Sequence, residues 1–299
     1  MKAQIKKIDF QGQVITVQLT TDALSDLEFK PGAPAIKSGG LIITEMNESG
    51  VVGLLRAQNT TEHFLLLTDA DILSGAKQTR IVNKSLLLAP HSTTMLDVSC
   101  VERSRWSKVS DKFDTSSHAA ANELRVEKAM FYAKEKGNAD KNRLQSQVWN
   151  KIEDEMKSNS FRSHTESYED LASFKQKENI PSFPEVKQMP ESTGLMVIRN
   201  GKVESLDLFG QQQVFEHYFE SLILAVQRSG MGKKTDEILP ESAVEDLVRE
   251  TFQKINSARE DQDKNYMGAG QFHHMESKDI IGGHLSYNKD LIHLTAFTR

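Results

Sequence analysis

Cysteine is the scarcest residue type in this sequence of 299 residues, which contains only Cys100. A single thiol cannot form an intramolecular disulfide, and it cannot build a cysteine-rich zinc site. No apolar run approaches the ~20 residues of a membrane-spanning helix, and residues 1–10 lack the apolar segment and cleavage site of an export signal. These absences predict a cytoplasmic protein without a membrane span.

Basic residues are not in excess either. The net charge is −5, and the imbalance lies in residues 191–299, which carry 12 basic and 17 acidic side chains. Nucleic-acid binding depends largely on neutralising phosphates, yet no stretch combines dense lysine and arginine with aromatic residues. We therefore expect no nucleic-acid partner, although a local basic pocket could still hold one small anion.

Short segments of high β propensity dominate residues 1–110. Residues 13–20, for example, read QVITVQLT, and their β-branched and apolar composition is typical of a strand. The spacing of such segments is typical of an antiparallel sandwich or barrel. The predicted strands cover residues 13–20, 41–46, 51–55, 64–67, 85–89 and 95–101.

A helical pattern follows in the middle of the chain. Apolar side chains recur every four residues between Leu144 and Met156, which predicts a helix over residues 139–157. The helix-favouring segment 119–136 precedes it, so we expect a helical hairpin. Residues 158–193 are polar and contain prolines, which predicts a long connection with at most one short helix.

Residues 194–299 return to mixed structure. Asn200-Gly201 is a strong hairpin signal, because both residues tolerate the positive φ of a tight turn. The predicted elements are a hairpin over 195–208, a helix over 214–227, a helix after Pro240 and a closing hairpin over 283–297.

Together these patterns predict an α+β fold. Residues 1–110 form an antiparallel β sandwich or barrel-like unit, and residues 111–193 form the helical hairpin with its proline-containing connection. Residues 194–299 form a section of β-hairpin, two helices and β-hairpin. Isolated hairpins are unstable, so we expect this last section to pack on residues 1–110 as one composite domain.

One polar stretch of the sequence suggests a ligand. The segment 75–80 (GAKQTR) offers a glycine-led turn with a lysine and an arginine, a set that suits phosphate or carboxylate groups. The segment 98–106 (VSCVERSRW) ends in Trp106, whose ring could stack on a base. The alternative is that the arginine pairs internally with one of three nearby acids, which are Asp69, Asp71 and Glu102.

These motifs also resemble a known family. GAKQTR, VSCVERSRW and the later QVW (147–149) are similar to the domain named for its association with ADP-ribosylglycohydrolases and rhodanese-phosphatase-superfamily proteins. The similarity runs along most of the chain and includes LDLFG (206–210). It implies a role in NAD or ADP-ribose metabolism, through association and without a particular reaction.

We expect polar and aromatic side chains of these motifs to converge on one ligand. Two short strands separated by Pro90 would return residues 100–106 to the turn at Gly75. Glu102 could then orient Arg105, accept from a ribose hydroxyl or act as a general base. The predicted ligand-binding residues are Lys77, Gln78, Arg80, Glu102, Arg105, Trp106 and Gln147.

The sequence thus predicts a protein that binds, and in one version processes, a phosphate compound derived from ADP-ribose or NAD. The alternative is a non-enzymatic interaction module that holds a partner enzyme of the same pathway. Whether the protein is an enzyme stays open, and the sequence predicts no cofactor.

Two other groups of reactive side chains are weaker candidates. Cys100 has no evident activating base, so we expect a buried and unreactive thiol. A group of histidines with one glutamate near the C-terminus could bind a metal, but its spacing matches no metal motif and we expect no metal site. That group is His273, His274, Glu276, His284 and His293.

Overall fold

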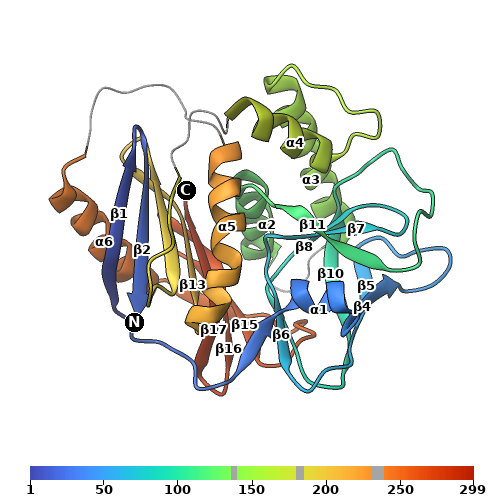
Figure 1. Ribbon diagram of the computed structural model, residues 1–299, viewed down its shortest axis with the longest axis horizontal. Coiled ribbons are helices and arrows are strands. Elements are labelled where there is room, and N and C mark those ends of the chain that lie inside the picture. Colours follow the sequence, from blue (N-terminus) through green and yellow to red (C-terminus); the bar gives the residue numbers. More distant parts are fainter. Residues whose placement is uncertain (136–139, 180–184, 230–238) are drawn as a thin grey trace.

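The computed structural model describes residues 1–135, 140–179, 185–229 and 239–299. It confirms the α+β fold, because the described residues form six helices and three sheets in which antiparallel pairing dominates (Figure 1). How the chain divides into domains stays a prediction.

The larger sheet has eight antiparallel strands and combines both ends of the chain. The N-terminal hairpin pairs with a strand that begins at Gly194, so it lies in the same sheet as the C-terminal strands. In sheet order the strands are β1 (Ala3–Gln11), β2 (Val14–Thr21), β12 (Gly194–Arg199), β13 (Lys202–Phe209), β17 (Asp290–Thr298), β16 (Ile280–Tyr287), β15 (Gln271–Glu276) and β14 (Arg259–Gln262).

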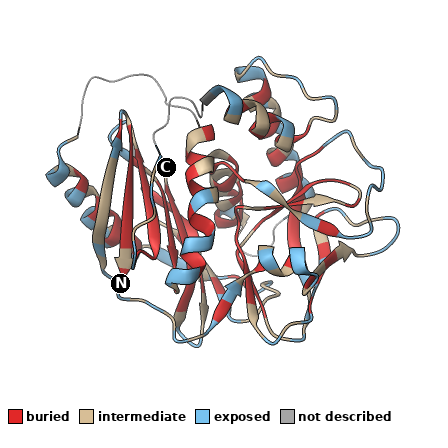
Figure 2. Cartoon of the chain, viewed as in Figure 1, coloured by how far each residue is buried: buried red, intermediate tan, exposed pale blue. Residues whose placement is uncertain are grey.

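Helices cover both faces of this sheet. In β12, Met196 and Ile198 belong to the core under α6 (Glu241–Asn256), while Leu195 and Val197 belong to the core under α5 (Gln212–Arg228). Successive side chains of a strand point to opposite faces, so a strand that is apolar on both sides needs two covering layers. Figure 2 shows the buried sides of both helices turned toward the sheet.

The other half of the molecule is built on two smaller sheets. The six-stranded sheet runs in the order β11 (Phe113–Ala119), β7 (Asp71–Gly75), β8 (Arg80–Val82), β10 (Thr93–Cys100), β5 (Leu54–Asn59) and β4 (Leu41–Glu45). The three-stranded sheet consists of β3 (Phe29–Pro31), β6 (Phe64–Leu67) and β9 (Leu86–Leu88), and its β3–β6 pair is parallel.

Four further helices pack on these sheets. α2 (Asn122–Glu135) packs against α3 (Lys141–Ser158), which confirms the predicted helical hairpin. The stripe from Leu144 to Met156 is buried as its period predicts. α4 (Tyr168–Asn179) contacts α5, and α1 (Gly32–Ser38) contacts β4 and β6.

A buried group of charges joins the two halves. Arg125 of α2 donates to both oxygens of Asp69, at 2.9 Å each, and to Oδ2 of Asp207 at 3.1 Å. It also donates to the hydroxyl of Thr295 at 2.8 Å. Asp69 precedes β7, whereas Asp207 and Thr295 lie in the eight-stranded sheet. Arg125 therefore cross-links the two halves through charge-assisted hydrogen bonds.

Candidate functional site

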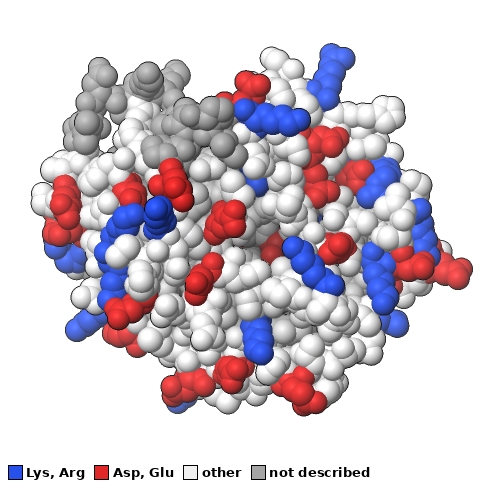
Figure 3. Space-filling model, in the orientation of Figure 1, with Lys and Arg blue, Asp and Glu red and all other residues white. Residues whose placement is uncertain are grey.

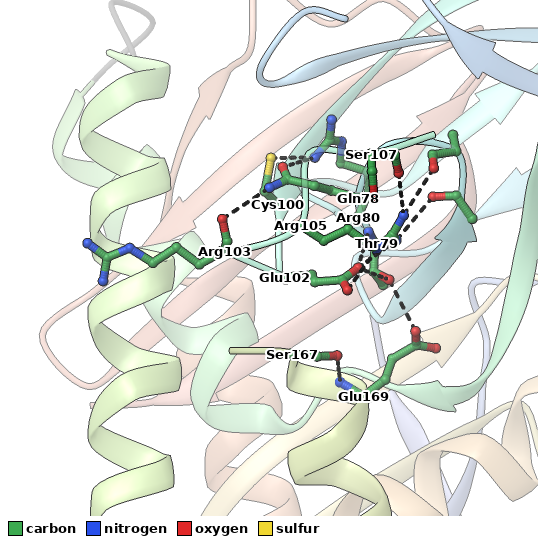
Figure 4. Close-up of polar contacts among 12 residues, drawn as sticks. Gln78, Thr79, Arg80, Cys100, Glu102, Arg103, Arg105, Ser107, Ser167 and Glu169 are labelled. Carbon is green, nitrogen blue, oxygen red and sulfur yellow. Dashed lines mark hydrogen bonds and ion pairs between the residues drawn. The ribbon is translucent and has the colours of Figure 1, made fainter. Parts of the chain in front are cut away.

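Antiparallel pairing brings the two polar motifs together. Arg80 at the start of β8 lies opposite Cys100 at the end of β10, and the N–H of Val101 donates to the carbonyl of Thr79 at 3.0 Å. Residues 101–106 therefore run beside residues 75–80. Figure 4 shows most of the resulting group. We call it the Arg80 cluster, and it comprises Lys77, Gln78, Thr79, Arg80, Cys100, Glu102, Arg105 and Trp106.

Arg80 is fully buried at the centre of the cluster. Its Nη1 donates to Oε1 of Gln78 at 2.8 Å and to Sγ of Cys100, and its Nη2 lies 3.5 Å from Oε1 of Glu45 on β4. Within the described residues, Nε and Nη2 of Arg80 have no hydrogen-bond partner, and neither have the carboxylate oxygens of Glu45. The buried guanidinium thus has a compensating charge nearby, and two of its nitrogens, Nε and Nη2, make no hydrogen bond within the described residues.

Arg105 and Glu102 satisfy one another. Arg105 donates from Nε to Oε1 of Glu102 at 2.8 Å and from Nη2 to Oε2 at 2.6 Å, and it also donates to the carbonyls of Ala76 and Ser107. Burial of Glu102 opposes its ionisation, but the hydrogen bonds from Arg105 and Thr79 outweigh burial and hold the pKa of Glu102 below its usual range. This pair fixes the loop after β10 against the turn at residues 75–80.

Arg80 faces an acid other than the three that the sequence suggests as its internal partners. Among the three acids considered, Asp69 pairs with Arg125, Asp71 accepts from Thr68 and Tyr218, and Glu102 pairs with Arg105. Arg80 instead faces Glu45, which lies 35 residues earlier in the sequence. Only the sheet order, with β4 two strands away from β10, places Glu45 there.

Trp106 forms the outer surface of the cluster, and 48% of it is exposed. The Nζ of Lys77 lies 5.5 Å from the ring centroid, and the guanidinium carbon of Arg80 lies 5.7 Å from it. Gly50 has a φ of +78°, and a Cβ there would approach Cζ2 of Trp106 to 3.2 Å. A side chain at this position would be strained and would crowd the ring. The ring therefore has two cations within cation–π distance and a backbone loop packed against it.

A second carboxylate connects the cluster to α4. The hydroxyl of Thr79 lies 3.1 Å from one oxygen of Glu102 and 3.1 Å from one oxygen of Glu169. The other oxygen of Glu169 accepts from the hydroxyl of Ser116 on β11. Thr79 and Glu169 thus link the cluster to β11, which is one edge strand of the six-stranded sheet.

On α3, Gln145 and Gln147 have different roles. Gln145 accepts from the N–H of Cys100 at 2.7 Å and donates to its carbonyl at 2.8 Å. Its side-chain amide therefore pairs with the backbone of β10 as a neighbouring strand would. Gln147 has a buried Oε1 that accepts no hydrogen bond from any described residue. The position of Gln145, three residues before Val148 and seven before Ile152, is the signal that places it on the buried face. A ligand-binding role for Gln147 and the six predicted cluster residues stays a prediction.

Cys100 is buried, as the sequence predicts. Burial raises the pKa of its thiol to about 11, although the charge of Arg80 opposes the increase. At neutral pH the sulfur is therefore a protonated thiol, which is a poor nucleophile.

The C-terminal histidines are dispersed. His273 and His284 stack across β15 and β16 with ring centroids 5.0 Å apart. His293 is buried, with Nδ1 2.8 Å from the hydroxyl of Ser85. His274 lies 3.4 Å from Asp263. Across the part of the chain that the structure describes, no three His, Cys, Asp or Glu side chains come together in a group that could hold a metal.

Among the described helices, none is long and apolar enough to span a membrane.

Comparison with known proteins gives a family for the chain. No curated protein and no solved structure matches the chain significantly. The family model of the ARG and Rhodanese-Phosphatase-superfamily-associated Protein domain matches residues 2–297. Because this match spans nearly the whole chain, the protein belongs to that family.

Proposed function

We propose that the Arg80 cluster binds a phosphate compound derived from ADP-ribose or NAD. The observation that carries the proposal is the position of Trp106, which is half-exposed and has Lys77 and Arg80 beside its ring. A nucleobase can stack on an indole ring, and a neighbouring cation can attract the phosphates that such a ligand carries. The name of the family supports the same chemistry, since it records an association with ARG proteins.

The cluster residues have different roles in this proposal. Lys77 and Trp106 are the outer contacts, for phosphate and base respectively. Arg80 and Gln78 supply inner polar groups, because the Nε and Nη2 nitrogens of Arg80 have no hydrogen-bond partner among the described residues. Glu102 and Arg105 position the loop and are already paired with each other. Gln147 is a further candidate contact from α3.

Calorimetric titration of the purified protein with ADP-ribose, NAD and ADP tests the proposal. Lys77→Ala and Trp106→Leu should each weaken binding about tenfold, which corresponds to a loss of ~1.4 kcal/mol. Both side chains are at least partly exposed, so the melting temperature should stay within a few degrees of that of the unmodified protein. Lys108→Ala is the matched control, because Lys108 lies on the same loop and pairs with Asp111.

The opposite pattern would mean that the cluster is structural. In that case none of the three compounds would bind, and Lys77→Ala and Trp106→Leu would lower the melting temperature instead. Arg80→Ala cannot make this distinction, since it leaves Glu45 buried without its cation and should destabilise the fold under either interpretation.

A second candidate function is docking of a pathway enzyme. It is favoured by the exposure of Trp106 and of Val109, which is 64% exposed on the same loop. Large exposed apolar side chains close together are typical of interaction surfaces. Size-exclusion chromatography with an ADP-ribosylglycohydrolase from the same genome tests it. Docking is favoured if the two proteins co-elute, if Val109→Asp abolishes the co-elution, and if none of the small compounds binds.

A further inference from the structure

A cavity of about 400 Å³ lies beside α5, on the other side of Glu169 from the Arg80 cluster. Its walls come from α1, β7, β11, α4 and α5. In the space-filling view a hollow opens between the positions of α5 and β11, and acidic atoms are visible in its floor (Figure 3). We call this cavity the Asp71 pocket, since Asp71 is the carboxylate at the start of β7 that lines it.

The carboxylate of Asp71 is held by one of its two oxygens. Oδ2 accepts from the N–H of Thr68 at 2.6 Å, from the hydroxyl of Thr68 at 3.2 Å and from the hydroxyl of Tyr218 at 3.0 Å. Oδ1 accepts no hydrogen bond from any residue that the structure describes. The two donors of Thr68, together with the hydroxyl of Tyr218 that the carbonyl of Leu66 shares, fix the orientation of the group. Because Asp71 lines the pocket, Oδ1 is a preorganised acceptor for a ligand there.

The histidines of the pocket are neutral at physiological pH. Burial lowers the pKa of His118 on β11 to about 4 and also lowers the pKa of His217 on α5. Nε2 of His118 lies 2.9 Å from the hydroxyl of Ser173, whereas its Nδ1 is buried and makes no hydrogen bond within the described chain. A neutral imidazole combines a donor with an acceptor, so these rings can bind hydroxyl groups without attracting an anion.

The remaining polar groups favour the same class of ligand. Ser117 and Ser221 contribute hydroxyls, and the charges at the opening are Lys37 and Glu220, which have opposite signs. An inward carboxylate would repel a phosphate, while hydroxyl groups can donate to it and accept from the histidines and serines. The volume is within the lower range of small-molecule pockets.

We propose that the Asp71 pocket binds a polyhydroxylated ligand of the sugar class, with Oδ1 of Asp71 accepting from its hydroxyl groups. The proposal is independent of the function proposed for the Arg80 cluster, because it rests on different side chains and on a ligand without phosphate.

Saturation-transfer NMR with millimolar D-ribose and D-glucose, each added to the full-length protein, tests this inference. Asp71→Asn is the informative variant, since its carbonyl can still accept from Thr68 and Tyr218 while its NH₂ group replaces the acceptor Oδ1. We expect at least one sugar to show saturable transfer with the unmodified protein and an affinity at least tenfold weaker with Asp71→Asn. Glu216→Gln, on the exposed surface of α5 and outside the pocket lining, should bind as the unmodified protein does.

Two results would overturn the inference. One is the absence of saturable transfer from both sugars, and the other is equal affinity for Asp71→Asn when circular dichroism shows that the variant is folded. Trp106→Leu separates this site from the cluster, since it should leave sugar binding unchanged while it weakens ADP-ribose binding.

Discussion

Replacing Arg125 with alanine should reveal how strongly the buried charges hold the two halves together. Arg125 is 1% exposed and is the cation that two buried carboxylates, Asp69 and Asp207, share. Removing it leaves both carboxylates buried without that cation, a change that costs about 3–5 kcal/mol in comparable buried pairs. This is a large part of the stability of a typical domain.

The pH dependence of the loss gives the sharper test. Burial raises the pKa values of Asp69 and Asp207, but the charge and hydrogen bonds of Arg125, together with Lys128 at Asp69 and His293 at Asp207, outweigh burial and lower both pKa values. The unmodified protein therefore loses this contribution as the pH falls below the unfolded pKa of about 3.9. Without Arg125, burial is still opposed by Lys128 at Asp69 and by His293 at Asp207, but burial is the largest influence on both groups. We therefore expect the carboxylates to bind protons more readily in the folded state, and the variant to regain stability as the pH falls.

Urea denaturation followed by circular dichroism measures both effects. Arg249→Ala is the matched control, because Arg249 is 65% exposed and pairs with Asp246 on the surface of α6, where such a pair contributes at most about 1 kcal/mol. The reasoning is refuted if Arg125→Ala costs no more than Arg249→Ala, or if the stability gap to the unmodified protein is as wide at pH 5 as at pH 7.

Three further predictions concern single positions. Asp71→Asn should stabilise the protein at pH 7 by up to about 3 kcal/mol. Burial raises the pKa of Asp71 from 3.8 to about 6, so the ionised carboxylate is less stable in the folded state than in the unfolded state. The gain should disappear in denaturation curves recorded below pH 4, where the carboxyl is protonated in both states. Cys100→Ala should fold with a modest loss of stability, and the native thiol should react slowly with iodoacetamide at pH 7, whereas fast alkylation would show an exposed thiolate. Leu87→Asp and Val98→Asp should each yield insoluble or unfolded protein, since both positions are at most 1% exposed and the new carboxylate would have no partner; soluble, native-like variants would contradict the burial of both strands.

Periodicity in the sequence predicts the longer elements well. The four-residue repeat of α3 and the alternating apolar residues of β2 each require one packing arrangement, and both are observed. Short strands carry no such information, because three residues such as Arg80–Val82 show no period. Nor does periodicity say which strands pair, so the position of β1 and β2 beside β12 follows only from tertiary packing.

The same distinction holds for the Arg80 cluster. The sequence analysis expects the two motifs to be adjacent, but the structure brings them together in another way: β8 pairs with β10, while β9, which lies between them in the sequence, belongs to the three-stranded sheet. The partner Glu45 is not foreseeable, since a contact between β4 and β8 depends on the order of strands in the sheet. The buried pairing of Arg105 with Glu102 is local, three residues apart, and was therefore within reach of sequence reasoning.

Tryptophan fluorescence measured during addition of ADP-ribose tests the central claim most directly. The chain has two tryptophans, so Trp149→Phe leaves Trp106 as the sole emitter. If the base stacks on this ring, the emission of Trp149→Phe should change saturably, with the midpoint that calorimetry gives, and Lys77→Ala in the same background should move that midpoint to higher ligand concentration. Calorimetric binding of ADP-ribose without any change in Trp106 emission, or no binding at all, would contradict the assignment of the Arg80 cluster as the ligand site.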